Sequence, residues 1–496
     1  MNRTSLLALI LGALSASPAL ALTPEEVWAM WQRQTTAQGG ATLTAQSQNR
    51  AGDTLVLSGV ASEIAPEGAE VRVRAEIGTI LMREVDGTVE ITLADSYPVT
   101  ITSDEPGSVT LRVSHPGMLL TAEGEAGAIG YTFSAPELAV TLDRFEAPEP
   151  FEATFSMTFA GIEGSYATSG TEAIEIGTDF AAESMTIAVA ARDPAAPGRF
   201  NLDWTSADSA ITGGGVLVPG AAPADDLPAL LRAGMIVDTD YAFGATTIAV
   251  DAADETGAPV RFGATFDSTS FGVGLAADAI SYSTLTEALS VLVSGGDMPF
   301  PELAVTAGEF GMGFLFPLAA AEAPSDASVV FRLVDLVLPD NVWAMGDPMG
   351  QLPRGPVTAI LDASGLVRVL TDLLAPEAME AAAPPVELHA LEISEFQVAA
   401  VGADLTGTGS FTFDNTDLQS FGGLPRPEGA LDLRLVGGNA LLDTLGAMGL
   451  IPDDQMMGAR MMLGLFARPG DGPDTLVSRI EVMPDGAVLA NGQRIR

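Results

Sequence analysis

From Thr42 onward, apolar and polar residues alternate with a period of two in many short runs. Residues 71–77 and 89–93 alternate most regularly, and Asp86-Gly87 between them is a typical hairpin turn. Gly, Pro, Asp and Ser separate the runs, which favours antiparallel neighbours over a βαβ series. The pattern predicts a mainly β fold: a long antiparallel, curved meander sheet, as an open barrel or a groove, with a few short helices.

A helical pattern precedes the strands. Thr23 suits the N-cap, Pro24 suits the first helical position, and Glu26 completes a capping box. Gly39-Gly40 predicts where this helix ends. Further helices are predicted at residues 226–233, 284–293, 366–374, 439–450 and 453–466, the last two forming a C-terminal helix pair. Turns are predicted at residues 406–409 and at Asp485-Gly486.

The N-terminal residues have the features of a secretion signal. Arg3 precedes an apolar run at residues 6–14 that is too short to span a bilayer, and Ala19-Leu20-Ala21 fits a cleavage site. We expect a signal peptide at residues 1–21, a periplasmic location and no stable membrane span after cleavage. The domains predicted after it are a β-rich, repeat-like region at 22–380, a linker at 381–385, and a C-terminal β region at 386–496 that continues the same sheet.

Two short sequences each occur twice in the chain. PELAVT occupies residues 136–141 and 301–306, and TIAV occupies residues 186–189 and 247–250. Repeated strands that extend one groove would explain both pairs. Chance in a chain rich in Ala, Thr and Val would explain them equally well, so the sequence leaves both interpretations open.

Charge and composition exclude several classes of function. The chain has 65 acidic and 22 basic residues and a formal net charge of −43, which disfavours nucleic acid and anionic lipid head groups as direct partners unless divalent cations bridge them. It has no cysteine and two histidines, and every basic residue is arginine. Thiolate nucleophiles, Schiff-base lysines and cysteine metal sites are therefore excluded, and no disulfide stabilises the chain.

No motif predicts a catalytic residue, a metal site or a cofactor. His115 and His389 have no nearby carboxylate at ligand spacing, and the Gly-x-Gly sequences lack the third glycine of a dinucleotide site. Two aspartate pairs offer oxygens for calcium but do not fit the twelve-residue calcium loop: Asp414 with Asp417, and Asp471 with Asp474. A carboxylate pair for hydrolysis stays an alternative, although no pair stands out among so many acids.

A methionine cluster in the predicted C-terminal helix pair is the candidate ligand-binding site. It comprises Met448, Met456, Met457, Met461 and Met462. Methionine adapts its shape, so two Met-lined helices can form a pocket for acyl chains or peptides. The alternative is that both helices close the end of the sheet as ordinary core.

Several sequences in the C-terminal third carry a family resemblance: residues 435–443, 460–463, 472–474 and 491–494. Together with Val27-Trp28 and residues 52–55, they resemble the alphaproteobacterial envelope family known as domain of unknown function 2125. This resemblance implies no catalytic residue. More distantly, an N-terminal helix followed by many strands is similar to AsmA-like envelope proteins. Their folded sheets offer an apolar trough for lipid, and they usually keep a membrane anchor.

These observations favour a non-enzymatic, exported envelope protein. We expect it to bind an apolar, lipid-like ligand, or to chaperone envelope components, through a curved β-sheet groove. The alternative is a structural or protein-interaction component of the periplasm whose exposed strands pair with a partner. A carboxylate-dependent hydrolase is the third candidate, and the sequence does not indicate the oligomeric state.

Overall fold

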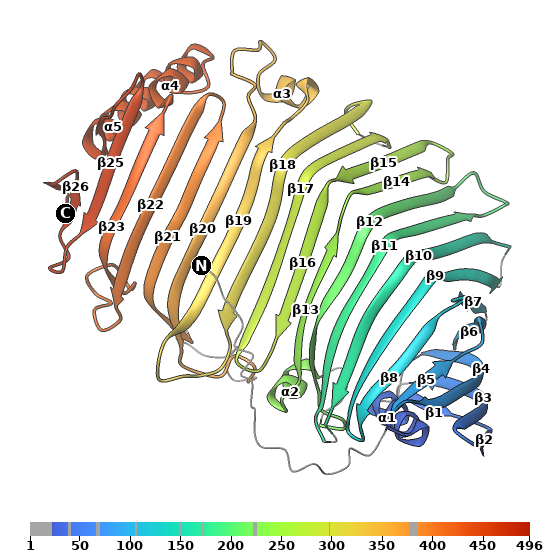
Figure 1. The fold of residues 1–496 in the computed structure, drawn as a ribbon. Helices are drawn as coiled ribbons and strands as arrows, with labels where there is room; N and C mark the ends of the chain where they lie inside the picture. The colour runs from blue at the N-terminus through green and yellow to red at the C-terminus, as the bar shows by residue number, and fades with distance from the viewer. Residues whose placement is uncertain are drawn as a thin grey trace.

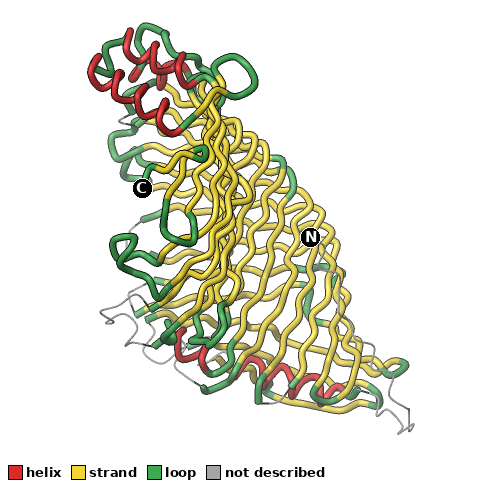
Figure 2. Tube along the Cα trace, turned by 90° about the vertical axis from the view of Figure 1, so that its left-hand side faces the viewer, coloured by secondary structure: helices red, strands yellow, loops and turns green. Residues whose placement is uncertain are grey.

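The computed structural model describes residues 22–37, 41–65, 70–104, 107–147, 150–170, 172–221, 226–296, 298–375 and 385–496. The strands form one antiparallel sheet that curves along its length (Figure 1). Helices lie at its two rims (Figure 2). The predicted mainly β fold with a curved antiparallel sheet, an N-terminal helix and a C-terminal helix pair is confirmed. Among the described residues, no helix has the length and apolar character needed to cross a bilayer.

The helices are α1 (Pro24–Ala37), α2 (Leu227–Arg232), α3 (Asp340–Gly346), α4 (Gly438–Ala447) and α5 (Asp453–Phe466). The first strands are β1 (Ala41–Thr44), β2 (Ser47–Ala51), β3 (Thr54–Ile64), β4 (Val71–Val85), β5 (Thr88–Thr92), β6 (Ser96–Ser103), β7 (Ser108–Ser114), β8 (Leu119–Glu125) and β9 (Ala128–Glu146). The middle strands are β10 (Glu152–Ser169), β11 (Ile174–Arg192), β12 (Arg199–Leu217), β13 (Ile236–Phe243), β14 (Thr246–Ala253), β15 (Pro259–Phe266), β16 (Ser268–Leu275), β17 (Ala279–Gly295) and β18 (Glu302–Pro317). The last strands are β19 (Ser325–Leu336), β20 (Val357–Val369), β21 (Val386–Ala400), β22 (Ala403–Asp414), β23 (Arg426–Val436), β24 (Arg468–Pro469), β25 (Thr475–Val482), β26 (Val488–Ala490) and β27 (Gln493–Arg494).

Long hairpins form most of the sheet, because successive strands pair antiparallel. β9, β10, β11 and β12 pair in chain order, with up to 19 residues in one strand. Some long strands are interrupted at mid-length: β13 and β14 both pair with β12, and β15 and β16 both pair with β17. β20 and β21, which precede and follow residues 376–384 in the sequence, pair with each other. One sheet therefore runs through both predicted β regions. The predicted linker lies almost wholly outside the described residues.

A line of irregular backbone, which we call the crease, crosses the sheet where these strands are interrupted. Left-handed backbone recurs along it, at Gly59, Gly78, Gly161, Asp208, Ala288 and Asp335. At Gly161, where φ is +58°, a Cβ atom would lie 2.6 Å from Cδ of Glu183. Glycine is therefore required there both by its conformation and by the close approach of a neighbouring side chain.

The densest core lies under α1 at the N-terminal end of the sheet. Thr23 and Glu26 form the predicted capping box, in which Glu26 accepts hydrogen bonds from the Thr23 backbone and hydroxyl at 2.9 and 2.8 Å. One side of α1 then packs on the sheet, burying apolar residues from the helix and from β3, β4, β5, β8 and β9. Val27, Met30 and Leu57 have no exposed surface. Burial of this apolar surface holds the helix in place.

The rest of the molecule is much more open than a compact protein. The accessible surface of the whole chain is 28109 Å², whereas a compact monomer of 51.0 kDa has about 17,000 Å². A single-layer sheet explains the difference, since it leaves both faces close to solvent. The fold therefore keeps broad sheet surfaces available for contact.

Two predicted helices are wrong. Residues 284–293 belong to β17 and residues 366–369 to β20, where neighbouring strands complete the hydrogen bonds of the backbone. The predicted turn at 406–409 is also wrong, because these residues lie inside β22 and the chain turns at Val401-Gly402 instead. Tertiary pairing outweighs local propensity in these segments. The helix α3 was not predicted.

Other local predictions are confirmed. Asp226 caps α2 by accepting a hydrogen bond from the backbone N–H of Ala229 at 3.0 Å. The C-terminal helix pair corresponds to α4 and α5, and turns lie at Asp86-Gly87 and Asp485-Gly486. The two TIAV copies both pair with residues 202–205 of β12, one on each side, so they occupy equivalent positions. The PELAVT copies are not equivalent, since Pro136 lies within β9 and Pro301 precedes β18.

Candidate functional site

One face of the sheet is apolar over fourteen strands. Residues opposite each other in antiparallel strands share a face, so the pairing register traces rows across the sheet. One row is Tyr131, Tyr166, Thr178, Gly213, Thr239, Val273, Tyr282, Phe314, Val329, Ala363, Ile393, Gly409, Leu431 and Ile480. The next is Phe133, Gly164, Phe180, Ile211, Tyr241, Phe271, Thr284, Met312, Phe331, Leu361, Phe396, Gly407, Leu433 and Ser478. These rows define what we call the apolar face, and they contain no charged residue.

The opposite face, which we call the polar face, has the reverse composition. One of its rows is Thr132, Ser165, Asp179, Thr212, Asp240, Gly272, Ser283, Gly313, Val330, Asp362 and Glu395. Ion pairs connect neighbouring strands on this face. Arg332 of β19 pairs with Glu309 of the neighbouring β18 at 2.8 Å and, across β20, with Glu395 of β21 at 3.2 Å. The strands therefore separate an apolar face from a charged one.

Aromatic rings contact one another along the apolar face. The ring centroids of Tyr241 and Phe271 lie 5.8 Å apart, those of Phe271 and Tyr282 5.3 Å, and those of Tyr282 and Phe314 6.0 Å. Trp204 lies on the other side of the crease and is 6.4 Å from Phe243. The apolar face therefore continues across the crease.

Side chains of the apolar face are accessible. Most are half-buried, and Met312 and Phe314 are 43% and 42% exposed. Large apolar patches on a protein surface are uncommon, and they mark contact sites for partners, membranes or ligands. The apolar face is the candidate functional site on this ground.

The loop before β23 encloses a hollow of about 660 Å³ at one end of the apolar face. Its lining is mainly apolar and includes Leu388, Phe413, Leu418, Phe421 and Leu424. Asp414 and Arg426 form an ion pair at 2.8 Å at the base of this loop. The volume is in the range of ligand-binding pockets.

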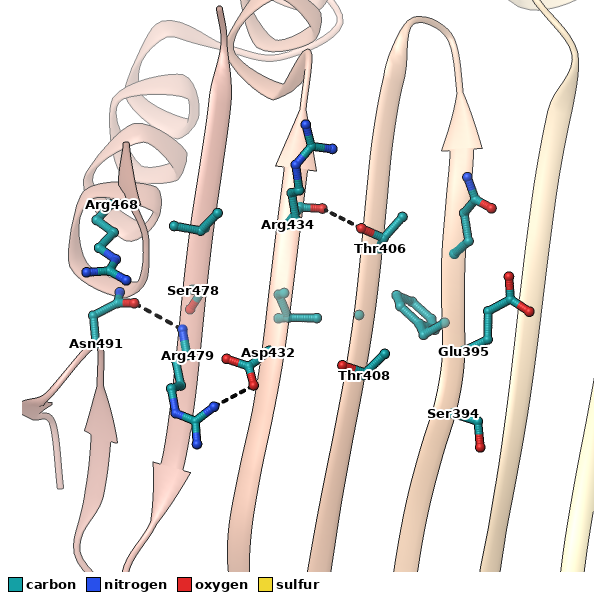
Figure 3. A pocket seen from close by; sticks show the side chains of 15 residues that line it. Ser394, Glu395, Thr406, Thr408, Asp432, Arg434, Arg468, Ser478, Arg479 and Asn491 are labelled. Atoms are coloured by element: carbon teal, nitrogen blue, oxygen red, sulfur yellow. Dashed lines mark hydrogen bonds and ion pairs between the residues drawn. The ribbon is translucent and has the colours of Figure 1, made fainter. Parts of the chain in front are cut away.

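A second hollow, of about 460 Å³, lies on the polar face between β21 and β25 (Figure 3). Some of its polar groups bond to one another: Arg479 pairs with Asp432 at 2.5 Å, and Thr406 donates to the carbonyl oxygen of Arg434 at 3.5 Å. Such satisfied pairs are typical of a solvated sheet surface. This hollow resembles the rest of the polar face more than a binding site.

The predicted methionine cluster lies on α5 and, with Met448, in the segment between α4 and α5, at the rim of the sheet (Figure 1). Met456 packs close to Gly446 of α4. Met457 and Met461, one helical turn apart on α5, are each 72% exposed. These methionines line none of the described hollows, and their role in ligand binding stays a prediction.

The two histidines lie on separate parts of the sheet. His115 is buried between β7 and β8 against the ring of Tyr97, at 5.8 Å. His389 is on β21, where its Nε2 atom is 3.4 Å from Glu387. Within the described ranges, no group of three or more His, Asp or Glu side chains could hold a metal ion.

Three of the four aspartates considered as calcium ligands, Asp414, Asp417 and Asp474, have structural partners. Asp474 accepts hydrogen bonds from Asn439 and Ala440 at the start of α4, and the backbone N–H of Ala440 is the main cause that lowers its pKa. The Thr416 hydroxyl, followed by Arg426, lowers the pKa of Asp414 to about 2. Both carboxyls are thus held in the charged form by neighbours that stabilise loops.

The apolar face was not identified from the sequence, although its signal is present there. Each strand shows the alternation that produces it, but which residues share a face depends on register. Register between distant strands is set by the whole sheet. The same alternation therefore predicted strands correctly and left the site unassigned.

Residues 293–492 match the family model described as "Uncharacterized protein conserved in bacteria (DUF2125)". Over these residues the chain is similar to the DUF2125 family. The DUF2125 region runs from the end of β17 to the turn after β26 and includes α3, α4 and α5. It confirms the family resemblance, over a shorter range than the sequence motifs suggested. Comparisons with curated proteins and with solved structures gave no match.

Proposed function

We propose that this chain is a non-enzymatic, exported envelope protein that binds a lipid-like apolar ligand on the apolar face, either to carry it or to chaperone it. The observation that carries the proposal is the continuity of uncharged, mainly apolar rows across fourteen strands. Contact with acyl chains would remove this surface from water, which is favourable by about 25 cal/mol per Å².

The dimensions of the apolar face fit several acyl chains or one large amphiphile. Thirteen steps between neighbouring strands, from β9 to β25, cover about 60 Å at the usual strand spacing. An extended acyl chain spans one leaflet of a bilayer core, which is about 15 Å thick. A single acyl chain therefore covers only a part of the length of the apolar face. We therefore expect more than one ligand molecule on each protein.

A non-enzymatic role agrees with the pKa values of the carboxyl groups. The carboxyls whose pKa is shifted in the described part of the chain are all lowered: Asp251, Asp254, Asp347, Asp414, Asp417 and Asp474. Hydrolysis by a carboxylate pair needs one acid whose pKa is raised, so that it keeps its proton. These groups therefore suit ion pairs and loops better than acid catalysis.

Strand addition by a protein partner is the less favoured alternative. The sheet ends in short strands, with five residues in β2 and two residues in β27. Short edge strands limit the number of backbone hydrogen bonds that an added strand can form. Binding on the broad apolar face needs no such edge.

Native mass spectrometry of the full chain, purified from its host's envelope without detergent, tests the proposal. We expect protein masses with one or more bound lipids, and loss of these lipids after extraction with organic solvent. Re-addition of a fluorescent fatty acid to the refolded protein should restore binding. Lipid-free preparations that also fail to take up the probe would overturn the proposal.

A further inference from the structure

Buried polar atoms without partners gather where α1 covers the first strands of the apolar face. The indole N–H of Trp28, the hydroxyl of Tyr131 and the hydroxyl of Thr168 have no hydrogen-bond partner among the described residues. The three residues are only 3%, 4% and 3% exposed. Thr168 lies opposite Ile129 in the neighbouring strand, and Ile129 is on the same face as Tyr131. Ile129, Tyr131 and Trp28 belong to one core cluster.

Such atoms are costly to bury. A buried donor or acceptor without a partner destabilises a protein, and folded proteins contain few of them. Three in one cluster point to a group that bonds to them. An indole N–H can only donate, and both hydroxyls can donate as well, so the group that fits is rich in acceptor oxygens.

Two further donors lie on the last turns of α1. The side-chain amide nitrogen of Gln34 is also buried without a partner. Arg33 is exposed and has no carboxylate partner in the described structure, and its guanidinium lies 3.6 Å from the sulfur of Met30. Burial raises the pKa of the Tyr131 hydroxyl, and the positive charge of Arg33 lies near enough to lower it in part. A guanidinium without a carboxylate partner offers a local positive charge in a chain of net charge −43.

Aromatic rings connect this cluster with the open apolar face. The rings of Trp31 and Tyr131 are 6.3 Å apart, and those of Tyr131 and Tyr166 are 5.9 Å apart. Trp31 also approaches the Tyr131 hydroxyl without forming a hydrogen bond of normal geometry. Beyond Tyr166 the rows continue as open apolar surface. A ligand with its polar end at α1 can thus extend its apolar part along the sheet.

We propose that Arg33, Gln34, Trp28, Tyr131 and Thr168 form a head-group site for an anionic amphiphile, a molecule with a carboxylate or phosphate head and an acyl chain. The inference rests on the proposed function and adds the chemical class of the ligand and its orientation. The head lies beside the last turns of α1, where Arg33 is exposed, and the acyl chain lies on the apolar face towards β10 and β11. Arg33 provides the positive charge, and the buried donors bind the remaining oxygens.

Isothermal titration calorimetry of the delipidated full chain with a long-chain fatty acid and with its methyl ester tests this site. We expect the acid to bind about tenfold more tightly than the ester, because only the acid carries the charge that Arg33 recognises. Arg33→Gln should remove this preference and leave the affinity for the ester unchanged. Arg232→Gln, at an exposed arginine on α2, is the matched control and should preserve the preference.

Tyr131→Phe separates a binding role from a structural one. It removes only a hydroxyl that has no partner in the protein, so stability should be unchanged while affinity for the acid falls several-fold. Lysophosphatidic acid in the same titration distinguishes a phosphate head from a carboxylate. Equal binding of acid and ester to the unmodified chain, or an unchanged preference in Arg33→Gln, would overturn the head-group site alone. Absence of binding by all of these ligands would overturn the proposed function as well.

Discussion

Tyr282 and Phe314 face each other across β17 and β18, with their rings stacked at an angle of 24° and their centroids 6.0 Å apart. Ser283, the next residue of β17, points to the polar face, opposite Gly313. The two faces thus differ in chemistry between adjacent residues of one strand. This contrast allows each face to be altered while the other is kept.

Phe314→Glu should impair binding of an apolar ligand. Phe314 is already 42% exposed, so a charge there places few new polar atoms in a core, but it interrupts the apolar rows. We expect the number of bound lipids seen by native mass spectrometry to fall by about half or more, with a stability change near 0.5–1 kcal/mol. Ser283→Glu adds the same charge to the polar face and should leave lipid binding unchanged. Equal lipid loss in both variants would show that charge, not the apolar face, controls binding.

Local signals in the sequence predicted the parts of the fold whose partners are local. The capping box of Thr23 and Glu26 and the Asp86-Gly87 turn act within a few residues, and both are present. Residues 284–293 carry a similar capping pattern and good helix formers, yet they lie between β15, β16 and β18. Helix propensity contributes only a few tenths of a kcal/mol per residue. Hydrogen bonds with three neighbouring strands outweigh it.

The candidate site illustrates the same limit. The methionines of α5 were singled out because they are close in sequence, whereas Tyr131 and Phe314 are 183 positions apart and share one row of the sheet. No local pattern links them, since the row depends on the register of each strand between them. The buried donors under α1 also come from distant segments, and only the fold brings them together.

Met30→Ala should destabilise the N-terminal core. The Met30 side chain has no exposed surface, and removal of a buried Met side chain leaves a cavity that costs about 2–5 kcal/mol. Urea unfolding followed by tryptophan fluorescence measures this loss, because Trp28 and Trp31 lie in or against the same core. Met457→Ala, at a methionine that is 72% exposed, is the matched control and should change stability by less than about 0.5 kcal/mol. Similar losses in the two variants would contradict the burial described for α1.

Gly161→Ala should strain the crease. The backbone there is left-handed, and the added Cβ atom would also displace the side chain of Glu183. We expect a loss of about 1–2 kcal/mol in the free energy of unfolding. Gly177→Ala, in β11, where a Cβ atom would meet nothing within 4 Å, should be close to neutral in the same urea titration. A neutral Gly161→Ala variant would mean that the crease needs no left-handed residue at this position.

Asp414→Asn should reduce the dependence of stability on acid pH. Thr416, Arg426 and the backbone of Thr416 together lower the pKa of Asp414 to about 2 from its ordinary value of 3.8. A group whose pKa is lowered in the folded state stabilises that state above the unfolded pKa, and this contribution disappears as the pH falls through the folded value. Asp414 therefore contributes fully above about pH 4 and loses its contribution between about pH 4 and pH 2.

Urea unfolding of the unmodified chain and of Asp414→Asn between pH 6 and pH 2 measures this effect. The variant should be less stable at pH 6, since Arg426 keeps Asp417 but loses the closer of its two charged partners, and the two proteins should converge as the pH approaches 2, where Asp414 is protonated. The convergence is an internal control for damage unrelated to charge. A stability difference that stays constant over the whole range would show that the ionised carboxylate does not hold the loop over the apolar hollow.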